Sequence, residues 1–445
     1  MKILSITAGA AGMYCGSCLR DNALAAELMA AGHDVQLVPI YTPTLTDEAN
    51  VSQHRVFFGG ISVYLQQYSG LFRHTPWIVD RLWDSRLALK LATRGSIAVD
   101  PDSLGELTIS MLKGEDGLQR KELQKLIHWM QTQTEPDVVI LPNSLLIALA
   151  RPIKEALNRP VLCTLQGEDL FIDGLRDRYR NLARDLIRAN IEFVDAFLPV
   201  SEYYSGFMTE YLAIPESKMH IVPLGITIDG YPAARRASSD AFVIGYLARV
   251  APEKGLHVLC EAYRRLRQRD HAPQRDHTSM MRLEVAGYLA REHRAYLAGI
   301  EQQMNEWGYA DEFHYRGVLD RQAKTEFLSG LDVLSVPATY DDAKGMFLLE
   351  AMAAAVPVVQ PRRGAFTEII EKTSGGLLVE PDDCDSLADG LMTIWESKPL
   401  AEELGRNGHE AVRRYYSAGS MARRAIEVFS SVVNGAVNGA SSQPN

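Results

Sequence analysis

This sequence has no long apolar run, few cysteines and no excess of positive charge. The longest uninterrupted apolar run is about six residues, at 145–150, whereas a membrane-spanning helix needs about 20. The five cysteines are an odd number in 445 residues, which does not resemble the disulfide framework of a small secreted domain. The N-terminus lacks the apolar core and cleavage site of a signal peptide. We therefore expect a cytoplasmic protein without transmembrane segments.

Acidic residues outnumber basic ones. The 56 Asp and Glu against 46 Lys and Arg give a formal net charge of −10, which disfavours a nucleic-acid partner, because such proteins carry an electropositive surface. A small phosphorylated ligand is not excluded, since a phosphate needs only a few local cations. Apolar residues make up 47% and charged residues 23% of the chain, an ordinary globular balance. At roughly 150 residues per domain, the length predicts two or three domains.

Sequence patterns typical of dinucleotide and zinc sites are also missing. The first glycine-rich loop, at 8–16, does not have the GxGxxG spacing, and no Walker A pattern occurs in the chain. Cys15 and Cys18 form a CxxC, which fits a redox pair, half of a zinc site or packing at the start of a helix. No second CxxC and no histidine pair completes a four-ligand zinc shell.

Two stretches of the chain begin in the same way, with an apolar run, a glycine-containing loop and an amphipathic helix. The first predicts a strand at 2–7, a helix at about 17–31 and a second strand at 35–39. The second predicts a strand at 241–247 and a helix from 256 to about 267. Strands that alternate with helices in this way predict an α/β fold with a doubly wound parallel sheet in each half. Ligands of such sheets bind at the carboxyl ends of the strands.

Composition also suggests where the domains end. The small and polar segment 231–240 is the best candidate linker, and it predicts an N-terminal domain at 1–230 and a C-terminal domain at 241–415. A last helix with one apolar face is expected at 416–433. The segment 434–445 is small and polar, so we expect it to be disordered.

The loop that follows the strand of the second half carries a cation at each end, Arg249 and Lys254. The loop stands directly before a helix, and two fixed cations opposite a helix N-terminus suit a diphosphate. The alternative is a pair of solvated surface charges.

A carboxylate lies in an otherwise apolar helix near the end of the second half. Gly345 opens this helix, and Glu350 lies inside it, where an ionised carboxylate is costly to bury without hydrogen-bond donors. Sugar or ribose hydroxyls would supply such donors, and so would a structural arginine. Asp342 stands in the preceding loop, so the two acids can contact two parts of one extended ligand. The phosphates of that ligand would face the amides of Gly345, Met346 and Phe347.

These motifs, in this order, resemble the family-four retaining glycosyltransferases of the GT-B fold. The matching stretches lie at 31–35, 195–202, 221–225, 245–255, 285–287, 315–317, 342–353 and 364–368. The resemblance covers nearly the whole chain apart from roughly 42–135. It implies two Rossmann-like domains that face each other across a cleft, and a C-terminal helix that returns to the N-terminal domain.

The resemblance implies that the chain transfers a sugar, with retention at the anomeric carbon, from a nucleotide-diphosphate donor to a glycan or lipid-linked acceptor. Family members of this fold need no metal ion, and the nucleotide sugar is a co-substrate rather than a cofactor. Positive groups and backbone amides would stabilise the charge on the leaving diphosphate. These groups are Arg249, Lys254, Gly345, Met346, Phe347 and, in the first glycine loop, Gly16.

The resemblance also assigns the other parts of the donor and the acceptor. Glu350 would hold the ribose, Asp342 would hold hydroxyls of the donor sugar, and the base would lie beside Arg316 and Val318. The acceptor would lie beside Glu168, Asp169, Gly59 and Gly60.

Two catalytic positions differ from the family pattern. Asp342 replaces the usual Glu and is one methylene shorter. Gln166 replaces a histidine, and it can donate a hydrogen bond to a sugar hydroxyl but cannot titrate near neutral pH. These two residues, with Lys254 and Arg249, are the predicted catalytic set.

Two further segments have more than one interpretation. Asp100-Pro-Asp102 is a DxD, the metal motif of the other large glycosyltransferase fold, but it precedes a helical pattern, which favours N-capping. The segment 71–94 is rich in Trp and Arg, which fits peripheral contact with a membrane surface or a lipid-linked acceptor. It fits an amphipathic core helix equally well.

Two other functions remain compatible with the sequence. The chain could be a nucleotide-sugar-binding protein that keeps the GT-B fold without catalysis, or it could epimerise a nucleotide sugar.

Overall fold

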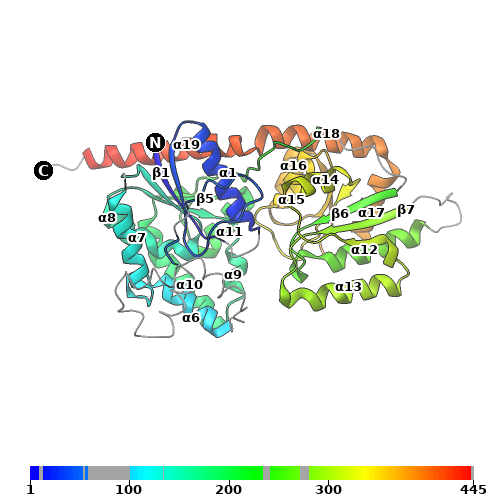
Figure 1. Cartoon of the computed structure of the whole chain (residues 1–445), viewed down its shortest axis with the longest axis horizontal. Helices are drawn as coiled ribbons and strands as arrows, with labels where there is room; N and C mark the ends of the chain where they lie inside the picture. The colour runs from blue at the N-terminus through cyan, green and yellow to red at the C-terminus, as the bar shows by residue number, and fades with distance from the viewer. Residues whose placement is uncertain are drawn as a thin grey trace. The chain divides into compact units, whose positions relative to one another are not determined.

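The structure is a computed structural model, drawn in Figure 1. The residues that it describes are 1–9, 14–53, 56–58, 101–133, 135–233, 241–270 and 280–441. The predictions that concern Gly59, Gly60 and the segment 71–94 therefore lie outside the described residues. The chain divides into two compact units, one made of Met1–Pro223 with Met421–Asn445, and the other of Leu224–Ser420.

The first unit holds a parallel sheet, five-stranded within the described residues, in the order β2-β1-β3-β4-β5. Its strands are β1 (Lys2–Thr7), β2 (Asp34–Pro39), β3 (Val138–Leu141), β4 (Val161–Leu165) and β5 (Ala196–Pro199). Strands β3, β4 and β5 are buried along their whole length, as expected for apolar strands covered on both faces. The strand order changes direction between β1 and β3, which makes the ends of these two strands the topological switch point.

Helices and short 3-10 turns connect these strands. The helices are α1 (Gly16–Ala30), α6 (Pro101–Leu112), α7 (Arg120–Thr132), α8 (Ala150–Leu157), α9 (Asp169–Asp173), α10 (Asp177–Asn190) and α11 (Glu202–Leu212). The 3-10 turns are η1 (Gly114–Asp116), η2 (Ser144–Leu149), η3 (Ile191–Phe193) and η4 (Glu216–Lys218). The strands predicted at 2–7 and 35–39 and the helix between them are confirmed.

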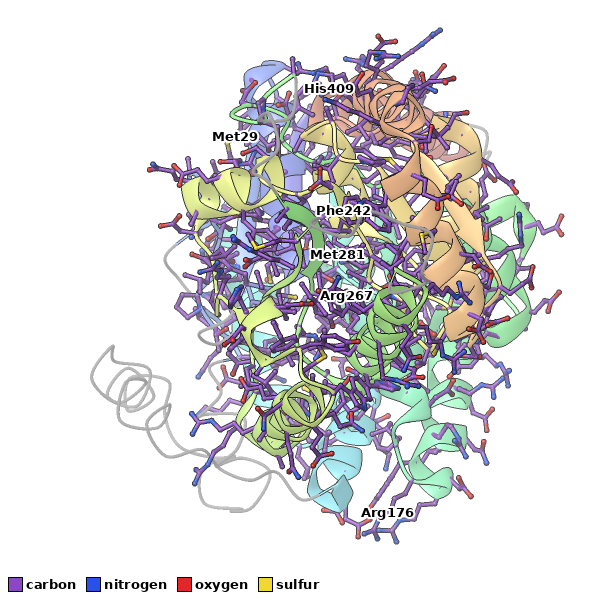
Figure 2. The ribbon with its side chains drawn as sticks, turned by 90° about the vertical axis from the view of Figure 1, so that its right-hand side faces the viewer. Met29, Arg176, Phe242, Arg267, Met281 and His409 are labelled. Atoms are coloured by element: carbon purple, nitrogen blue, oxygen red, sulfur yellow. The ribbon has the colours of Figure 1, made fainter. Side chains whose placement is uncertain are left out.

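The second unit holds another parallel sheet, six-stranded within the described residues, in the order β11-β10-β9-β6-β7-β8. Its strands are β6 (Ala241–Leu247), β7 (Met280–Ala286), β8 (Phe313–Tyr315), β9 (Val333–Leu334), β10 (Val358–Pro361) and β11 (Gly376–Val379). Phe242 on β6 and Met281 on β7 are register partners and are labelled in Figure 2. The strand order changes direction between β6 and β9, so the switch point lies there.

The helices of the second unit alternate with its strands. They are α12 (Leu256–Asp270), α13 (Arg294–Glu306), α14 (Arg321–Ser329), α15 (Met346–Ala353), α16 (Gly364–Thr373), α17 (Cys384–Glu396) and α18 (Lys398–Tyr415). The 3-10 turns are η5 (Pro252–Lys254), η6 (Arg291–His293) and η7 (Ala310–Glu312). His409 on α18, labelled in Figure 2, makes a hydrogen bond of 2.8 Å to the carbonyl of Ala353 and so fixes α18 to the end of α15.

The predicted fold class is confirmed, because each unit is a doubly wound parallel sheet. The second unit begins at Leu224, before the predicted linker. Its first residues are held within it, since Arg321 donates to the carbonyls of Thr227 and Asp229 at 2.7 Å each. Of the predicted linker, residues 234–240 lie outside the described residues.

The end of the chain differs from the prediction. Helix α19 spans Ala418–Ser441, so the expectation of disorder from 434 onwards is wrong for 434–441. The composition of 434–441 suggested disorder, because its Gly and Asn residues are weak helix formers. The stretch contains no proline, however, and it directly continues a helix that has one apolar face. In the part of the chain that the structure describes, no helix combines the length and apolarity that a membrane span requires.

Candidate active site

The two loops at the switch point of the second unit carry residues of the predicted donor site. Lys254 lies in the loop after β6, and Asp342 lies in the loop after β9. Because β6 and β9 are parallel neighbours, their carboxyl ends meet at one edge of the sheet, where ligands of this fold class bind. The topology therefore brings together two residues that are far apart in the sequence.

Lys254, Asp342 and Tyr340 form a buried cluster at this edge. The Nζ atom of Lys254 lies 2.6 Å from Oδ2 of Asp342 and also contacts the hydroxyl of Tyr340. That hydroxyl donates to Oδ2 of Asp342 at 2.9 Å. The side chains of Lys254 and Asp342 are only 12% and 7% exposed. Burial alone would raise the pKa of Asp342, but the ammonium of Lys254 and the hydrogen bonds outweigh it and hold that pKa below its usual range.

The second oxygen of Asp342 is engaged as well. Oδ1 accepts from the amides of Lys344 at 2.9 Å and Gly345 at 3.3 Å. Gly345 has φ +61, a left-handed conformation that glycine adopts at little cost, and α15 begins at the next residue, Met346. Asp342 therefore holds both Lys254 and the loop before α15 in place. Its predicted contact with the donor sugar stays a prediction.

The backbone conformation at Gly255 fixes the position of Lys254 beside the loop that follows β9. Gly255 follows it with φ +72, and a Cβ at Gly255 would lie 1.8 Å from the carbonyl oxygen of Pro337. The close approach of the two loops thus requires glycine. Arg249, at the other end of the loop, is exposed and pairs with Glu253 at 3.2 Å, so the structure leaves its predicted role in diphosphate binding untested.

Glu350, the predicted ribose ligand, has a cationic partner. Nζ of Lys324 lies 2.5 Å from its Oε1, and both side chains are 9% exposed. The hydroxyl of Tyr231 lies 3.5 Å from the same oxygen. The sequence left open whether ribose hydroxyls or a structural arginine would stabilise this buried acid, and in the structure a lysine does so.

The predicted base-side residues differ in their surroundings. Arg316 makes two hydrogen bonds to the carboxylate of Glu284 on β7, at 2.6 and 2.9 Å. Val318 is 51% exposed. The two residues follow β8, at the same edge of the sheet as Lys254.

The predicted catalytic Gln166 lies at the carboxyl end of β4 in the first unit. Its amide nitrogen donates to the carbonyl of Pro142 at 2.7 Å, and its carbonyl oxygen is buried without a partner among the described residues. Its backbone amide donates to Oε2 of Glu168 at 2.7 Å. Oε1 of Glu168 accepts from the backbone amide and the hydroxyl of Ser144, at 3.0 and 2.9 Å.

Asp169 begins α9 beside this cluster. The hydroxyl of Tyr204 donates to its Oδ1 at 2.7 Å. Burial raises the pKa of Asp169, and the hydrogen bond from Tyr204 opposes that shift only in part.

The first glycine loop is described only at its two ends. Gly16 is the first residue of α1, and Cys15 is the residue before it. Neither Cys15 nor Cys18 forms a disulfide within the described residues. A hydrogen bond with Cys15 and burial raise the pKa of the Cys18 thiol, which does not favour a reactive thiolate. The predicted role of Gly16 in phosphate binding stays a prediction.

The DxD motif is only half described. Asp102 lies inside the first turn of α6, where it pairs with Arg178 at 3.0 Å and also contacts Arg176. Asp100 lies outside the described residues. Asp102 is the second residue of α6, so the predicted N-capping role does not apply to Asp102. Across the described ranges, no three His, Cys, Asp or Glu side chains gather in a way that could hold a metal ion.

Sequence reasoning missed three residues of these clusters. Lys324 shares the buried face of α14 with Leu328, four residues later, and a lysine on such a face is a signal that it has a buried partner. Tyr340 is close to Asp342 in the sequence, but its orientation could not be foreseen. Asn143 lies two residues after the fully apolar strand β3, a position that is typical of a residue at a ligand-binding edge.

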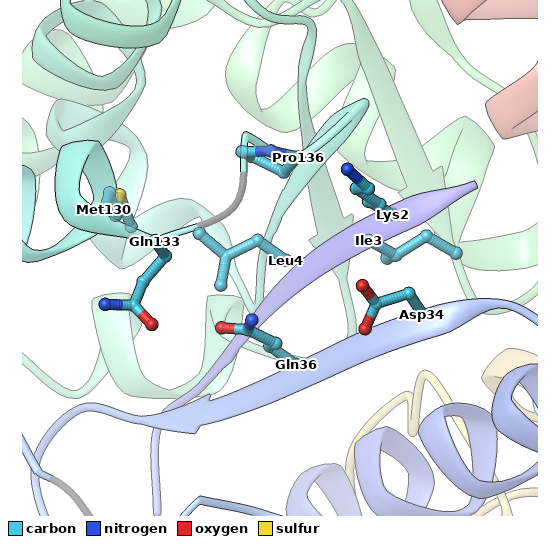
Figure 3. Close-up of a pocket in the computed structure, with 8 residues that line it drawn as sticks. All are labelled: Lys2, Ile3, Leu4, Asp34, Gln36, Met130, Gln133 and Pro136. Atoms are coloured by element: carbon cyan, nitrogen blue, oxygen red, sulfur yellow. The ribbon is translucent and has the colours of Figure 1, made fainter.

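A small pocket lies at the opposite, amino-terminal edge of the first sheet (Figure 3). It is lined by residues of β1, β2 and α7 and by the segment after α7: Lys2, Ile3, Leu4, Asp34, Gln36, Met130, Gln133 and Pro136. Because ligands of this fold class bind at the carboxyl edge, this pocket is not part of the candidate site.

Comparison with protein families matches both parts of the chain. Residues 229–411 match the family described as Glycosyl transferases group 1, and residues 22–225 match the Glycosyl transferase 4-like domain. The first match contains Lys254, Asp342 and Glu350, and the second contains Gln166.

Curated relatives resemble part of the chain. A phosphatidyl-myo-inositol mannosyltransferase of Mycobacterium tuberculosis (strain CDC 1551 / Oshkosh) is 29% identical over 203 residues, which are 44% of this chain and 49% of that protein. An MMP alpha-(1->4)-mannosyltransferase of Mycolicibacterium hassiacum is 27% identical over 232 residues, 52% of each protein. The chain thus spans about half the length of the curated relatives that it matches.

Solved structures resemble the whole chain. Anabaena Alr3699/HepE in complex with UDP and glucose has a TM-score of 0.64 and 16% identity, covering 97% of this chain and 100% of that one. A sucrose-phosphate synthase of Thermosynechococcus elongatus has a TM-score of 0.69 and 18% identity, covering 98% and 100%. At such identities the likeness concerns the fold, which is GT-B.

Proposed function

Both parts of this chain match glycosyltransferase families and its fold is GT-B, and on that premise we propose that it is a group 1 glycosyltransferase that transfers a hexose from a nucleotide-diphosphate donor. The acceptor in this proposal is a glycan or a lipid-linked sugar, the reaction retains the anomeric configuration, and no metal ion takes part.

The observation that carries the proposal is the pair of Lys254 and Asp342 at the switch point of the second unit, 2.6 Å apart. A buried ammonium at the carboxyl edge of a Rossmann-like sheet, beside the start of α15, suits a diphosphate. The first amides of a helix lack intrahelical acceptors, so those of Met346 and Phe347 suit the same anion.

The chemistry assigned to this site is charge stabilisation. When the bond between the anomeric carbon and the diphosphate oxygen breaks, negative charge develops on the leaving phosphate. Lys254 stabilises that charge best in the transition state, because the ammonium is already positioned and partly desolvated. Arg249 adds a second cation, and Glu350 holds the ribose, so that the leaving group is fixed while the sugar moves.

Two sets of names support a nucleotide-sugar donor. Alr3699/HepE is described in complex with UDP-glucose, and a Mycobacterium tuberculosis relative is named a GDP-mannose-dependent mannosyltransferase. By their names, that relative acts on a phosphatidylinositol monomannoside and another relative acts on phosphatidyl-myo-inositol, which supports a lipid-linked or glycan acceptor.

Ligand binding tests the proposal directly. The melting temperature of the full chain is measured with UDP, GDP, UDP-glucose and GDP-mannose. The measurement is repeated on Lys254→Ala and on a control, Lys398→Ala, which changes an exposed lysine of the same unit. A ligand at one hundred times its dissociation constant adds about 2.7 kcal/mol, which corresponds to several degrees in the melting temperature. We expect one nucleotide to stabilise the wild type and the control but not Lys254→Ala.

Turnover separates the proposal from its alternatives. Release of the nucleoside diphosphate with a sugar-containing product of retained configuration, unaffected by EDTA, supports it. A nucleotide sugar that binds without transfer or slow hydrolysis contradicts it and favours the non-catalytic function. An altered sugar nucleotide formed without any acceptor favours the epimerase. Failure of all four nucleotides to bind contradicts the donor site itself.

A further inference from the structure

Two cysteines at the start of α1 take no part in the function proposed above. Cys15 is the residue before α1, and Cys18 is the third residue of the helix. The amide of Leu19 donates to the carbonyl of Cys15 at 2.9 Å, so Cys15 already belongs to the first helical turn. Residues three apart in such a turn have Cα atoms about 5 Å apart, which lies within the range of about 4.4–6.8 Å that a disulfide bridges.

The side chains of the two cysteines are directed at the same place. The residue before a helix and the third residue of the helix are the two positions of a capping box, and both side chains at these positions lie over the first turn. The thiols of Cys15 and Cys18 are accordingly hydrogen-bonded to each other. A covalent bond between the two sulfurs therefore needs no rearrangement of the helix.

The two thiols differ in their access to solvent. Cys15 is half-buried, whereas Cys18 is 0% exposed. Cys15 lies at a helix N-terminus, where the backbone amides favour a thiolate. Burial and the contact with Cys15 raise the pKa of the Cys18 thiol, so this thiol stays protonated and is reached only by the neighbouring sulfur. This is the division between an attacking thiol, Cys15, and a resolving thiol, Cys18.

We propose that Cys15 and Cys18 form a reversible dithiol–disulfide pair that exchanges with a low-molecular-weight disulfide, and that its oxidation weakens the binding of a diphosphate at the start of α1. The exchange itself is independent of the proposed function. The effect on the diphosphate rests on the proposed function, because it requires the predicted contact of Gly16 with the donor.

The exchange balances with glutathione disulfide as the oxidant. The thiolate of Cys15 attacks one sulfur of glutathione disulfide, the S–S bond of that molecule breaks, and one glutathione leaves. The sulfur of Cys18 then attacks the Cys15 sulfur of the mixed disulfide, and the second glutathione leaves. The two cysteines lose two electrons and two protons, which appear in two molecules of reduced glutathione.

The disulfide would enclose the residue that is predicted to contact the donor. Gly16 and Ser17 lie between the two cysteines, and the first amides of a helix suit an anion because they lack intrahelical acceptors. A bridge from Cys15 to Cys18 lies across these amides and occupies the place of the anion. Because the coupling is reciprocal, a bound nucleotide should favour the dithiol by the same factor by which oxidation weakens nucleotide binding.

The first measurement follows the thiols of the full, reduced chain. The protein is incubated with mixtures of glutathione and glutathione disulfide, the remaining thiols are alkylated, and the modified peptides are identified by mass spectrometry. We expect a disulfide between Cys15 and Cys18 that dithiothreitol reverses completely. The buried Cys163 and Cys260 should stay reduced.

Variants separate the exchange from simple exposure of a thiol. In Cys18→Ala the resolving thiol is missing, so glutathione should remain on Cys15 at least tenfold longer than in the wild type. In Cys15→Ser the buried Cys18 should stay reduced. All variants are full chains whose folded state is checked by circular dichroism and melting temperature.

Cys384 provides a matched control. It is also half-buried and is the first residue of a helix, α17, but Leu387 stands three residues further on. Cys384 should therefore keep its glutathione in the wild type, and Cys384→Ser should leave the exchange of Cys15 and Cys18 unchanged. The pair is overturned if glutathione stays on Cys15 of the wild type as long as in Cys18→Ala. It is also overturned if Cys384 is modified while Cys15 is not.

The second measurement compares the affinity for UDP and GDP of the reduced and the oxidised protein, both carrying Cys384→Ser. Oxidation should lower the affinity for the nucleotide that binds at least tenfold, which is about 1.4 kcal/mol. Dithiothreitol should restore it, and the further double variant Cys15→Ser/Cys18→Ala should not respond to the oxidant. Equal affinity in the two states overturns the effect on the diphosphate. If the reduced protein binds no nucleotide, the proposed function fails, whereas the mass spectra still decide whether the pair exists.

Discussion

The carboxyl edges of the two sheets satisfy their buried polar groups in different ways. In the second unit, Lys254 is paired with Asp342, and at the same edge Lys324 is paired with Glu350, with partner atoms at 2.6 and 2.5 Å. In the first unit, the buried amide oxygen of Gln166 has no partner within the ranges that the structure describes. One site is complete without a ligand, and the other is not.

This difference predicts different responses to a ligand. A diphosphate must compete with Asp342 for Lys254, so part of its attraction is offset by the pair that it replaces. A sugar hydroxyl at Gln166 meets no competitor and recovers the cost of an unpaired acceptor. Removal of one partner should therefore damage the second unit far more than the first.

The largest effect is expected for Lys254→Ala. It removes the cation of the diphosphate site, so donor affinity should fall by more than one hundredfold, which is about 2.7 kcal/mol. It also leaves the buried carboxylate of Asp342 without its counter-ion, which should lower the free energy of unfolding by about 3–5 kcal/mol. Calorimetric titration and chemical denaturation measure the two effects.

The double variant Lys254→Ala/Asp342→Asn separates binding from stability. Because it removes both charges, most of the stability should return while donor affinity stays lost. Recovered donor binding in the double variant would mean that Lys254 only neutralises Asp342 and does not contact the diphosphate.

A comparable loss of stability, with a smaller loss of binding, is expected for Lys324→Met. This lysine does not belong to the predicted diphosphate site, but its removal leaves Glu350 buried and unpaired, so the free energy of unfolding should fall by about 3 kcal/mol. The single variant Glu350→Gln should no longer discriminate between ribose and 2′-deoxyribose donors. The double variant Lys324→Met/Glu350→Gln should recover stability but should still lack this discrimination. A double-mutant cycle in urea gives the coupling energy. Additive effects would show that the two side chains do not stabilise each other.

These pairs also mark what the sequence could not predict. The strand at 241–247 and the loop with Lys254 follow from local apolar and glycine patterns, and both are confirmed as secondary structure. The pairing of Lys254 with Asp342 joins residues 88 positions apart, and it depends on β9 lying beside β6, which local patterns do not encode. Glu350 was correctly expected to need donors, but its partner lies on α14, whose packing against α15 is a tertiary property.

In the first unit, the family resemblance named Gln166 and Glu168 as site residues, and in the structure they follow β4. It could not show that Glu168 is fully engaged by Ser144 and Gln166, because that requires two loops to meet across neighbouring strands. Asn143 was missed for the same reason. The chemistry of individual residues is visible in a sequence, whereas the number of partners that each residue has is not.

The smallest effects concern the stability of the protein in acid. The change in unfolding free energy caused by ionisation of the buried aspartate should have opposite signs in the two units. Asp342 has a pKa below its usual range, so it contributes stability that is present above its unfolded pKa, about 3.9, and is lost as the pH falls. The free energy of unfolding of Asp342→Asn should therefore fall less steeply below about pH 4 than that of the wild type. Asp169 has a raised pKa because it is buried, so its ionised form lowers stability at neutral pH.

Asp169→Asn should accordingly raise the free energy of unfolding at pH 7, by less than about 1 kcal/mol, since the hydrogen bond from Tyr204 is kept. The gain should shrink as the pH falls and Asp169 becomes neutral in the wild type. Urea denaturation from pH 3 to pH 7 for both variants measures the two slopes. If the gain in unfolding free energy for Asp169→Asn grew on acidification, the ionised form of Asp169 would not be the destabilising one. The contrast between a charge-paired site at Asp342 and a site at Asp169 that disfavours charge would then be wrong.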